Sequence, residues 1–171
     1  MHAGAGQDEV LMSVQLDTPI DQEPLELEAY TLLRQVNSMM DTHNRYDLRS
    51  DDLTIPQFMI LNYATANGVA LSEISARMLC DNSNLTGIVD RLIVKGYVRR
   101  RPDPEDRRVS LICLTPTGSE KLRQIKPRHH ARVSRRMRSL SETQVHDLRD
   151  LLQQLYASLQ QRHPGEDNLL S

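Results

Sequence analysis

The spacing of apolar residues along the chain predicts a series of helices interrupted by one short β-hairpin. From Pro24 onward, leucine, valine, tyrosine and methionine recur on one broad helical stripe as far as Met40. This pattern predicts a long first helix that frays between His43 and Asp47. Residues 1–24 have little periodicity and contain early glycines and two prolines, so we expect a flexible arm there.

The stretch "LTIPQFMIL" predicts the start of a second helix. Thr54 can cap it, Gln57 three residues later completes a capping box, and Pro56 suits the first turn because its missing N–H is not needed there. The tripeptide Ala-Asn-Gly at 66–68 is a C-terminal signal, so we expect the helix to end nearby. A short helix from Leu71 to Leu79 should follow, with a break at "CDNS".

The next helix, "NLTGIVDRLIVKG", has one apolar and one polar face. Its apolar residues recur at i, i+3, i+4 and i+7, and these are Leu85, Ile88, Val89 and Leu92. The other face presents small polar groups and one arginine, namely Ser83, Asn84, Thr86, Gly87, Asp90 and Arg91. Gly96 stops the helix. A polar helix face is often simply solvated, and that interpretation stays open for Asn84 and Thr86 taken alone.

Two β runs, "YVRRR" and "VSLICLT", flank the turn "PDPEDR" and predict a hairpin. At its tip, Asp106 can hold the loop in register through Arg108. "LTPTG" then opens a long helix capped by Thr115, and "LSETQVHDL" opens the last helix with Ser141 and Gln144 as a capping box. The predicted fold is mainly α with a small β-hairpin wing, a helix-turn-helix lobe joined to a second, helical region.

Charge is unevenly distributed along the chain. Net charge is −2, but residues 1–33 hold seven acids and no Lys or Arg, which leaves 21 bases against 16 acids in residues 34–171. Between Arg91 and Arg108 there are seven bases and three acids. A polyanion responds to this local surplus rather than to the average.

Several classes of protein are disfavoured. Two cysteines, Cys80 and Cys113, are too few for a disulfide scaffold, and the histidines show no metal-binding spacing, so we expect no metal and no cofactor. No nucleophile elbow, phosphate loop or carboxylate pair points to an enzyme. No apolar run approaches the roughly 20 residues of a membrane span, and no signal peptide is evident. We therefore expect a cytoplasmic protein that is not associated with a membrane.

The order of elements favours DNA as the partner. Two short helices joined by a tight break, with small polar donors exposed on the second, match a helix-turn-helix whose second helix enters a major groove about 12 Å wide. The arginines of the following hairpin suit phosphates and the negative potential of a narrow minor groove. The predicted contacts are Ser83, Asn84, Thr86, Arg91, Arg99, Arg101, Asp106, Arg107 and Arg108. Taken alone, the arginine strand is also consistent with an ordinary charged edge strand.

From Leu53 to about Leu159 the chain resembles the MarR family of winged helix-turn-helix regulators. The motifs that support this are "LTIPQFMIL", "IVDRLIVKGYVRR", "DPEDRRVSLICLTPTG" and "LSETQVHDLRDLL", in that order. The third is the most specific, because a D-x-R wing tip is followed by an L-T-x-x-G helix start. One departure is Gly87, which stands where many members of the family carry an arginine.

The resemblance implies a homodimer on a pseudo-palindromic double-stranded operator, with recognition helices one helical turn apart. It implies helical dimerisation segments at 25–50 and 116–162, a DNA-binding lobe at 53–115, an acidic arm at 1–24 and a tail at 163–171. Ser83, Asn84 and Thr86 would face the major groove, and Arg107 or Arg108 the minor groove.

The resemblance also implies a repressor released from DNA by a small aromatic acid of the phenolic, benzoate or nicotinate type. Arg34 is a candidate clamp for the carboxylate, with Met39, His43 and Tyr63 as walls or hydrogen-bond partners, although Arg34 also suits a salt bridge in the dimer interface. The alternatives are a redox-responsive regulator acting through Cys80, a constitutive DNA binder, and a winged-helix protein-interaction module. The sequence identifies neither the effector, the operator, the target genes nor the sign of regulation.

Overall fold

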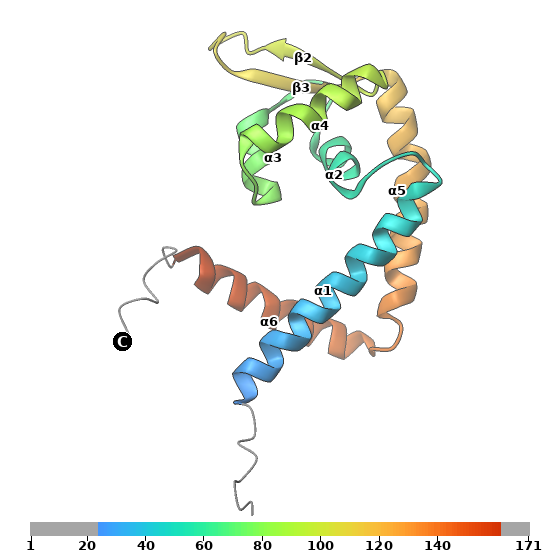
Figure 1. The fold of residues 1–171 in the computed structure, drawn as a ribbon, viewed down its shortest axis with the longest axis vertical. Coiled ribbons are helices and arrows are strands. Elements are labelled where there is room, and N and C mark those ends of the chain that lie inside the picture. Colours follow the sequence, from blue (N-terminus) through green and yellow to red (C-terminus); the bar gives the residue numbers. More distant parts are fainter. Residues whose placement is uncertain (1–23, 162–171) are drawn as a thin grey trace, which may run out of the picture. The chain divides into compact units, whose positions relative to one another are not determined.

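The computed structural model describes residues 24–161, and its contacts divide the chain into two units between Thr42 and His43. The predicted acidic arm, apart from Pro24, and the predicted tail lie outside the described residues. Along the chain the helices are α1 (Leu25–Arg49), α2 (Ile55–Tyr63), α3 (Leu71–Met78), α4 (Asn82–Val94), α5 (Pro116–Met137) and α6 (Glu142–Gln161), and the strands are β1 (Val69–Ala70), β2 (Val98–Pro102) and β3 (Ser110–Leu114) (Figure 1). This is the mainly α fold with a small wing that the sequence predicts.

The first unit contains most of α1, and it exposes its apolar stripe. The side chains of Leu25, Tyr30, Val36 and Met39 are all more than half exposed within the described structure. Because apolar stripes of this width are normally covered in a folded protein, this face is available for a partner.

The second unit contains a compact lobe with one apolar core. The core is formed by side chains from α2, α3, α4 and the sheet, and includes Ile60, Leu61, Ile74, Leu85, Val89, Leu92 and Ile112, each at most 1% exposed. Thr54 and Gln57 form the predicted capping box of α2, with the Thr54 N–H donating to Gln57 Oε1 at 3.0 Å and the Gln57 N–H to Thr54 Oγ1 at 3.4 Å. The core therefore fixes the apolar face of α4 and leaves its other face in solvent.

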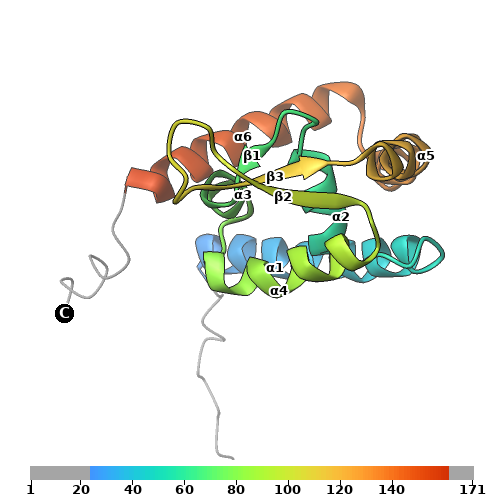
Figure 2. The ribbon, with the colours of Figure 1, turned by 90° about the horizontal axis from the view of Figure 1, so that it is seen from above.

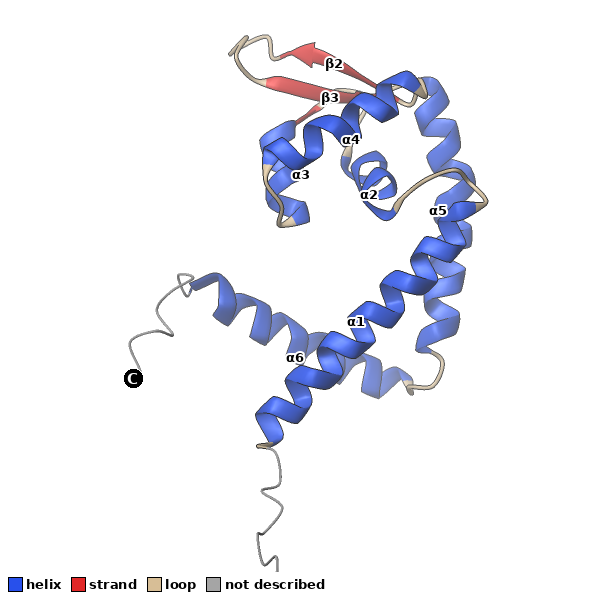
Figure 3. Ribbon diagram, viewed as in Figure 1, coloured by secondary structure: helices blue, strands red, loops and turns tan. Residues whose placement is uncertain are grey.

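The lobe carries a three-stranded antiparallel sheet in the order β1-β3-β2. Figure 3 shows its β2 and β3 hairpin in red. The hairpin of β2 and β3 was expected, whereas the two-residue strand β1 was not. The prediction that α2 ends near residues 66–68 is wrong, because Ala64 already adopts an extended backbone and the Thr65 carbonyl accepts a hydrogen bond from the Leu114 N–H at 2.8 Å. The segment after α2 thus joins the sheet instead of prolonging the helix.

The C-terminal end of α1 is anchored to α5, and the prediction that this helix frays between His43 and Asp47 is wrong. The guanidinium of Arg136 donates to Asp47 Oδ2 and, at 2.8 Å, to Asn44 Oδ1, while Arg132 donates to the Asp47 carbonyl at 3.0 Å. Leu48 on the next position is only 2% exposed. These long-range contacts keep the segment helical to Arg49.

One turn further on, Asp51 is buried between α1 and α5. Its carboxylate lies 3.3 Å from Lys121 Nζ and 2.8 Å from Arg128 Nη2, so two cations compensate one buried charge. His129 on the same helix packs on Phe58, with ring centroids 4.7 Å apart, and burial lowers its pKa. The lobe and α5 are therefore joined by ionic and aromatic contacts.

The last helix, α6, begins as predicted. The Ser141 N–H donates to Gln144 Oε1 at 2.8 Å, and the Gln144 N–H donates to Ser141 Oγ at 3.2 Å. None of its residues is buried, and its apolar stripe lines a groove of about 610 Å³. Within residues 24–161, every helix is too short or too polar to cross a lipid bilayer.

Candidate DNA-binding surface

The polar face of α4 is exposed as the sequence predicts. Leu85, Val89 and Leu92 are at most 1% exposed, while Ser83, Asn84 and Thr86 are exposed on the other side. Leu79 caps the C-terminal end of α3 in the left-handed conformation, with φ at 51°, and α4 starts three residues later. The hydroxyl of Ser75 donates to the Cys80 carbonyl and stabilises this turn. The two helices therefore form a helix-turn-helix in which α4 presents short donors and acceptors.

Strand β2 contacts one side of α4 through Arg100. Arg100 Nη1 lies 3.0 Å from Asp90 Oδ1, and Arg100 Nη2 donates to the Thr86 carbonyl at 3.4 Å. The two elements also lie next to each other in the view of Figure 2. Arg100 is one of the hairpin arginines that the sequence assigns to phosphates, and here its guanidinium contacts α4. It fixes the recognition helix relative to the wing.

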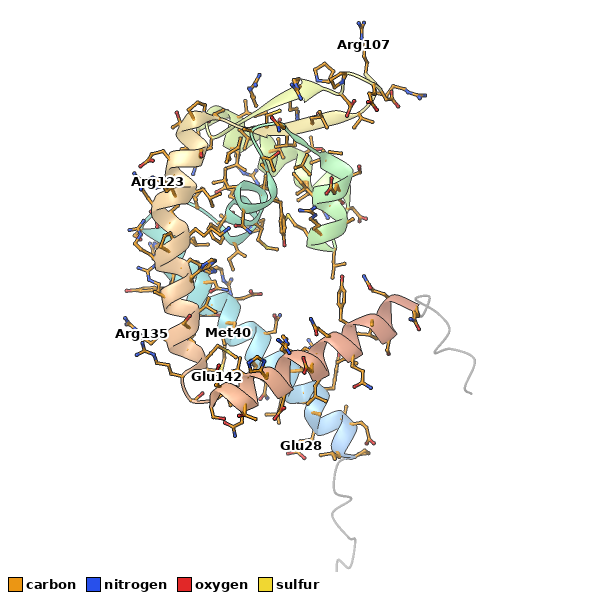
Figure 4. All side chains as sticks on the ribbon, turned by 180° about the vertical axis from the view of Figure 1, so that it is seen from behind. Glu28, Met40, Arg107, Arg123, Arg135 and Glu142 are labelled. Atoms are coloured by element: carbon orange, nitrogen blue, oxygen red, sulfur yellow. The ribbon has the colours of Figure 1, made fainter. Side chains whose placement is uncertain are left out.

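The wing tip is organised by two aspartates. Asp103 Oδ1 accepts from the Glu105 N–H at 2.8 Å, and the Asp106 carboxylate accepts from the N–H, Nε and Nη2 of Arg108 at 3.0, 3.1 and 3.3 Å. This confirms that Asp106 and Arg108 hold the loop. Arg107 projects from the tip into solvent (Figure 4). The tip thus presents two exposed arginines, Arg107 and the 92%-exposed Arg108, on a hydrogen-bonded loop.

The other two predicted arginines of the wing differ in their surroundings. Arg99 is exposed opposite Cys113 in the sheet register, whereas Arg101 is half-buried and its Nη2 donates to the Asn67 carbonyl at 2.8 Å. Arg99 is therefore free to face a phosphate, and Arg101 ties β2 to the turn before β1. Arg91 is exposed on α4.

The two cysteines occupy different environments. Cys113 is 0% exposed in β3 and acts as a small apolar side chain. Cys80 is half-buried at the turn before α4. Across residues 24–161 no three His, Cys, Asp or Glu side chains gather in a way that would hold a metal ion.

The four residues predicted to bind an aromatic acid are divided between the two units. In the first, the Arg34 guanidinium lies 5.8 Å from the centre of the Tyr30 ring, and Met39 is 63% exposed. In the second, His43 is exposed, and Arg77 lies 5.7 Å from the centre of the half-buried Tyr63 ring. The ligand pocket stays a prediction.

The contact between Asp106 and Arg108 at the wing tip should persist at mildly acidic pH. Hydrogen bonds from the Arg108 side chain, and then from its backbone N–H, hold the pKa of the Asp106 carboxyl below its usual value of 3.8. Because the folded-state pKa is lowered, the contact contributes fully above the unfolded-state pKa of about 3.9 and is lost as pH falls through the folded-state value. We expect the NMR shift of Arg108 Nε–H to stay constant from about pH 7 to 5 and to change only below about pH 4.

The matched control for this titration is Asp106→Asn, which keeps an acceptor but cannot titrate. It should remove the acid-induced change in the Arg108 signal. A change centred above about pH 4 in the wild-type protein would contradict the assigned contact.

An exposed polar helix on an apolar core, braced by an arginine-bearing β-hairpin, defines the chain as a winged helix-turn-helix DNA-binding protein. Residues 53–110 match the model of the MarR family. The chain is 30% identical over 125 residues to the HTH-type transcriptional repressor IacR of Pseudomonas putida, an alignment that covers 69% of this chain and 75% of IacR. The protein belongs to the MarR family. It is a DNA-binding transcriptional regulator and not an enzyme.

Solved structures agree with this assignment. CouR from Rhodococcus jostii RHA1, bound to p-coumaroyl-CoA, superposes with a TM-score of 0.70 at 31% identity, over 78% of this chain and 95% of CouR. A mutant of MarR from E. coli complexed with operator DNA superposes with a TM-score of 0.69 at 26% identity, over 81% of this chain and 99% of that one.

Proposed function

We propose that the protein is a homodimeric repressor that acts in the cytoplasm, binds a pseudo-palindromic operator and is released from it by a small aromatic acid. The observation that supports operator recognition most directly is the surface formed by the exposed polar face of α4 and the arginine-bearing wing. By this proposal Ser83, Asn84 and Thr86 contact base edges, Arg91 and Arg99 contact phosphates, and Arg107 enters the minor groove.

The dimer is supported by two exposed apolar faces. On α6, Leu151, Leu155 and Leu159 are 64%, 44% and 58% exposed, and α1 separately exposes a stripe of its own. Faces of this kind are unusual on a monomer in water, and a two-fold partner would cover them. We therefore assign residues 25–50 and 116–162 to dimerisation and residues 53–115 to DNA binding.

An aromatic effector is supported by the ligand of one solved relative, and an acid by residue chemistry alone. IacR is named a transcriptional repressor, and CouR was crystallised with an aromatic acyl thioester. A carboxylate-bearing aromatic ligand needs a cation and apolar walls, and the candidates are Arg34 and Met39 in the first unit and His43 and Tyr63 in the second. The ligand shifts the DNA equilibrium only through different affinities for the bound and released conformations.

The proposal is tested by fluorescence anisotropy with genomic fragments, including the protein's own upstream region, titrated with aromatic acids. We expect nanomolar, salt-sensitive binding to one palindromic fragment that one acid relieves and peroxide does not. Specific binding that peroxide alone relieves would favour control through Cys80 instead. Specific binding that neither an aromatic acid nor peroxide relieves would indicate a constitutive DNA binder. Absence of specific binding would contradict the operator proposal and leave only the assignment of the winged-helix fold.

A further inference from the structure

A basic pocket lies where the end of α1, the start of α2 and the end of α4 meet, and Arg91 is the one predicted DNA contact in its lining. It has a volume of about 520 Å³. Its charged lining residues are Arg45, Arg49, Asp52, Arg91 and Lys95, and the rest of the lining is formed by residues 53–57. We call this the basic pocket.

Positive charge dominates the basic pocket. It holds four cations and one anion, a surplus of three. Lys95 Nζ lies 2.9 Å from Asp52 Oδ2, which lowers the Asp52 pKa and neutralises one cation. Neither Arg49 nor Arg91 makes an ion pair within the part of the chain that the structure describes. The pocket therefore suits an anion that an arginine fork can bind.

The pocket lies beside the recognition helix, on the flank opposite the wing. At about 100° per residue, Arg91 and Lys95 point to one flank of α4 and Thr86 and Asp90 to the other. The second flank is the one that Arg100 of β2 contacts, through the Thr86 carbonyl and the Asp90 carboxylate. A helix seated in a major groove has a phosphate backbone on each side. With the wing following one backbone, the basic pocket faces the other.

We propose that the basic pocket binds a backbone phosphate of the operator and forms, with the wing, a two-sided clamp on α4. Arg49 supplies the principal contact from outside the helix-turn-helix, and Arg91 and Lys95 contribute from α4. This inference rests on the proposed operator binding. It adds a site whose contribution is independent of base sequence, because a phosphate contact positions the protein without reading bases.

The first test is the salt dependence of operator binding by Arg49→Gln. Each lost phosphate contact should lower the slope of log K against log salt by about 0.9, and by about 1.8 for a dimer with two pockets. Between 50 and 200 mM salt the variant should thus lose about 3.5-fold less affinity per pocket than the wild type does. Specific and non-specific duplexes should be weakened alike.

The matched control is Arg123→Gln, which removes the same charge from an exposed site on α5 that does not line the pocket (Figure 4). It should leave the slope near that of the wild type. Equal thermal melting of both variants and the wild type shows that folding is intact. A wild-type slope for Arg49→Gln would overturn the proposal.

A second test locates the phosphate. Neutral methylphosphonate linkages are introduced one at a time along a half-site. One linkage outside the bases read by α4 should weaken binding by the wild type and leave binding by Arg49→Gln unchanged. If every linkage affects both proteins equally, Arg49 contacts no phosphate. If the wild type binds no duplex specifically, the operator proposal itself fails, which is a different result.

Inorganic pyrophosphate distinguishes a small anion from DNA as the occupant. We expect it to compete only at millimolar concentration, as a general electrolyte does. Saturable micromolar binding that Arg49→Gln abolishes, together with an unchanged DNA salt slope, would assign the pocket to a small phosphorylated ligand and overturn the assignment to DNA.

Discussion

Replacing Gly118 by alanine should destabilise the protein by about 3 kcal/mol or more and lower Tm by roughly 10 °C, although the same change usually stabilises a helix by about 1 kcal/mol. Gly118 lies in the first turn of α5, against the end of the recognition helix. A Cβ there would lie 1.9 Å from the carbonyl oxygen of Tyr97 and 2.8 Å from its carbonyl carbon. Because both atoms are backbone, no side-chain rotation relieves the clash.

The affected junction joins three elements. Thr115 Oγ1 donates to the Gly96 carbonyl at 2.7 Å and accepts from the Gly118 N–H at 3.0 Å. The residues that end α4, begin β2 and cap α5 therefore meet at one point. A shift there moves the wing relative to the recognition helix, so DNA binding should fall together with stability.

Gly87→Ala is the matched control for Gly118→Ala. Its added Cβ would meet only Arg91 Nη1, at 3.9 Å, so it should stabilise α4 by up to about 1 kcal/mol. Differential scanning calorimetry of the two variants shows whether Gly118→Ala lowers the melting temperature while Gly87→Ala raises it. Equal melting temperatures would show that the junction can relax, contrary to the close approach at Tyr97.

The Ser83→Ala, Asn84→Ala double variant should bind its operator about 100-fold more weakly and keep its non-specific affinity and salt slope. Both side chains are exposed on α4, so their removal leaves the core intact. A good contact to a base edge contributes about 1–3 kcal/mol of discrimination, and two of them account for a loss of this size. Anisotropy on operator and scrambled duplexes measures both affinities.

A control double variant, Asn62→Ala with Ser134→Ala, removes the same groups from exposed positions on α2 and α5. Its operator affinity should equal that of the wild type. If the Ser83→Ala, Asn84→Ala protein loses affinity for scrambled and operator duplexes equally, the two residues contact the DNA backbone or support the helix. In that case they do not read bases.

Local signals determined most of the fold and much of the candidate site. The caps at Thr54, Thr115 and Ser141 depend on residues three positions apart, so they are visible in the sequence and are present in the structure. The apolar period of α4 likewise predicts which of its faces is exposed. The Asp106–Arg108 contact spans two residues and was predicted for the same reason.

Only the tertiary structure decided the features that depend on residues far apart in sequence. Asp47 and Arg136 are 89 positions apart, yet their contact keeps the end of α1 helical. Arg101 donates a hydrogen bond to the carbonyl of a residue 34 positions away. The basic pocket gathers cations from α1 and α4 that no local spacing relates. Periodicity and capping motifs report interactions within a few residues of one another. The position of Arg49 beside the recognition helix depends on how the whole lobe packs.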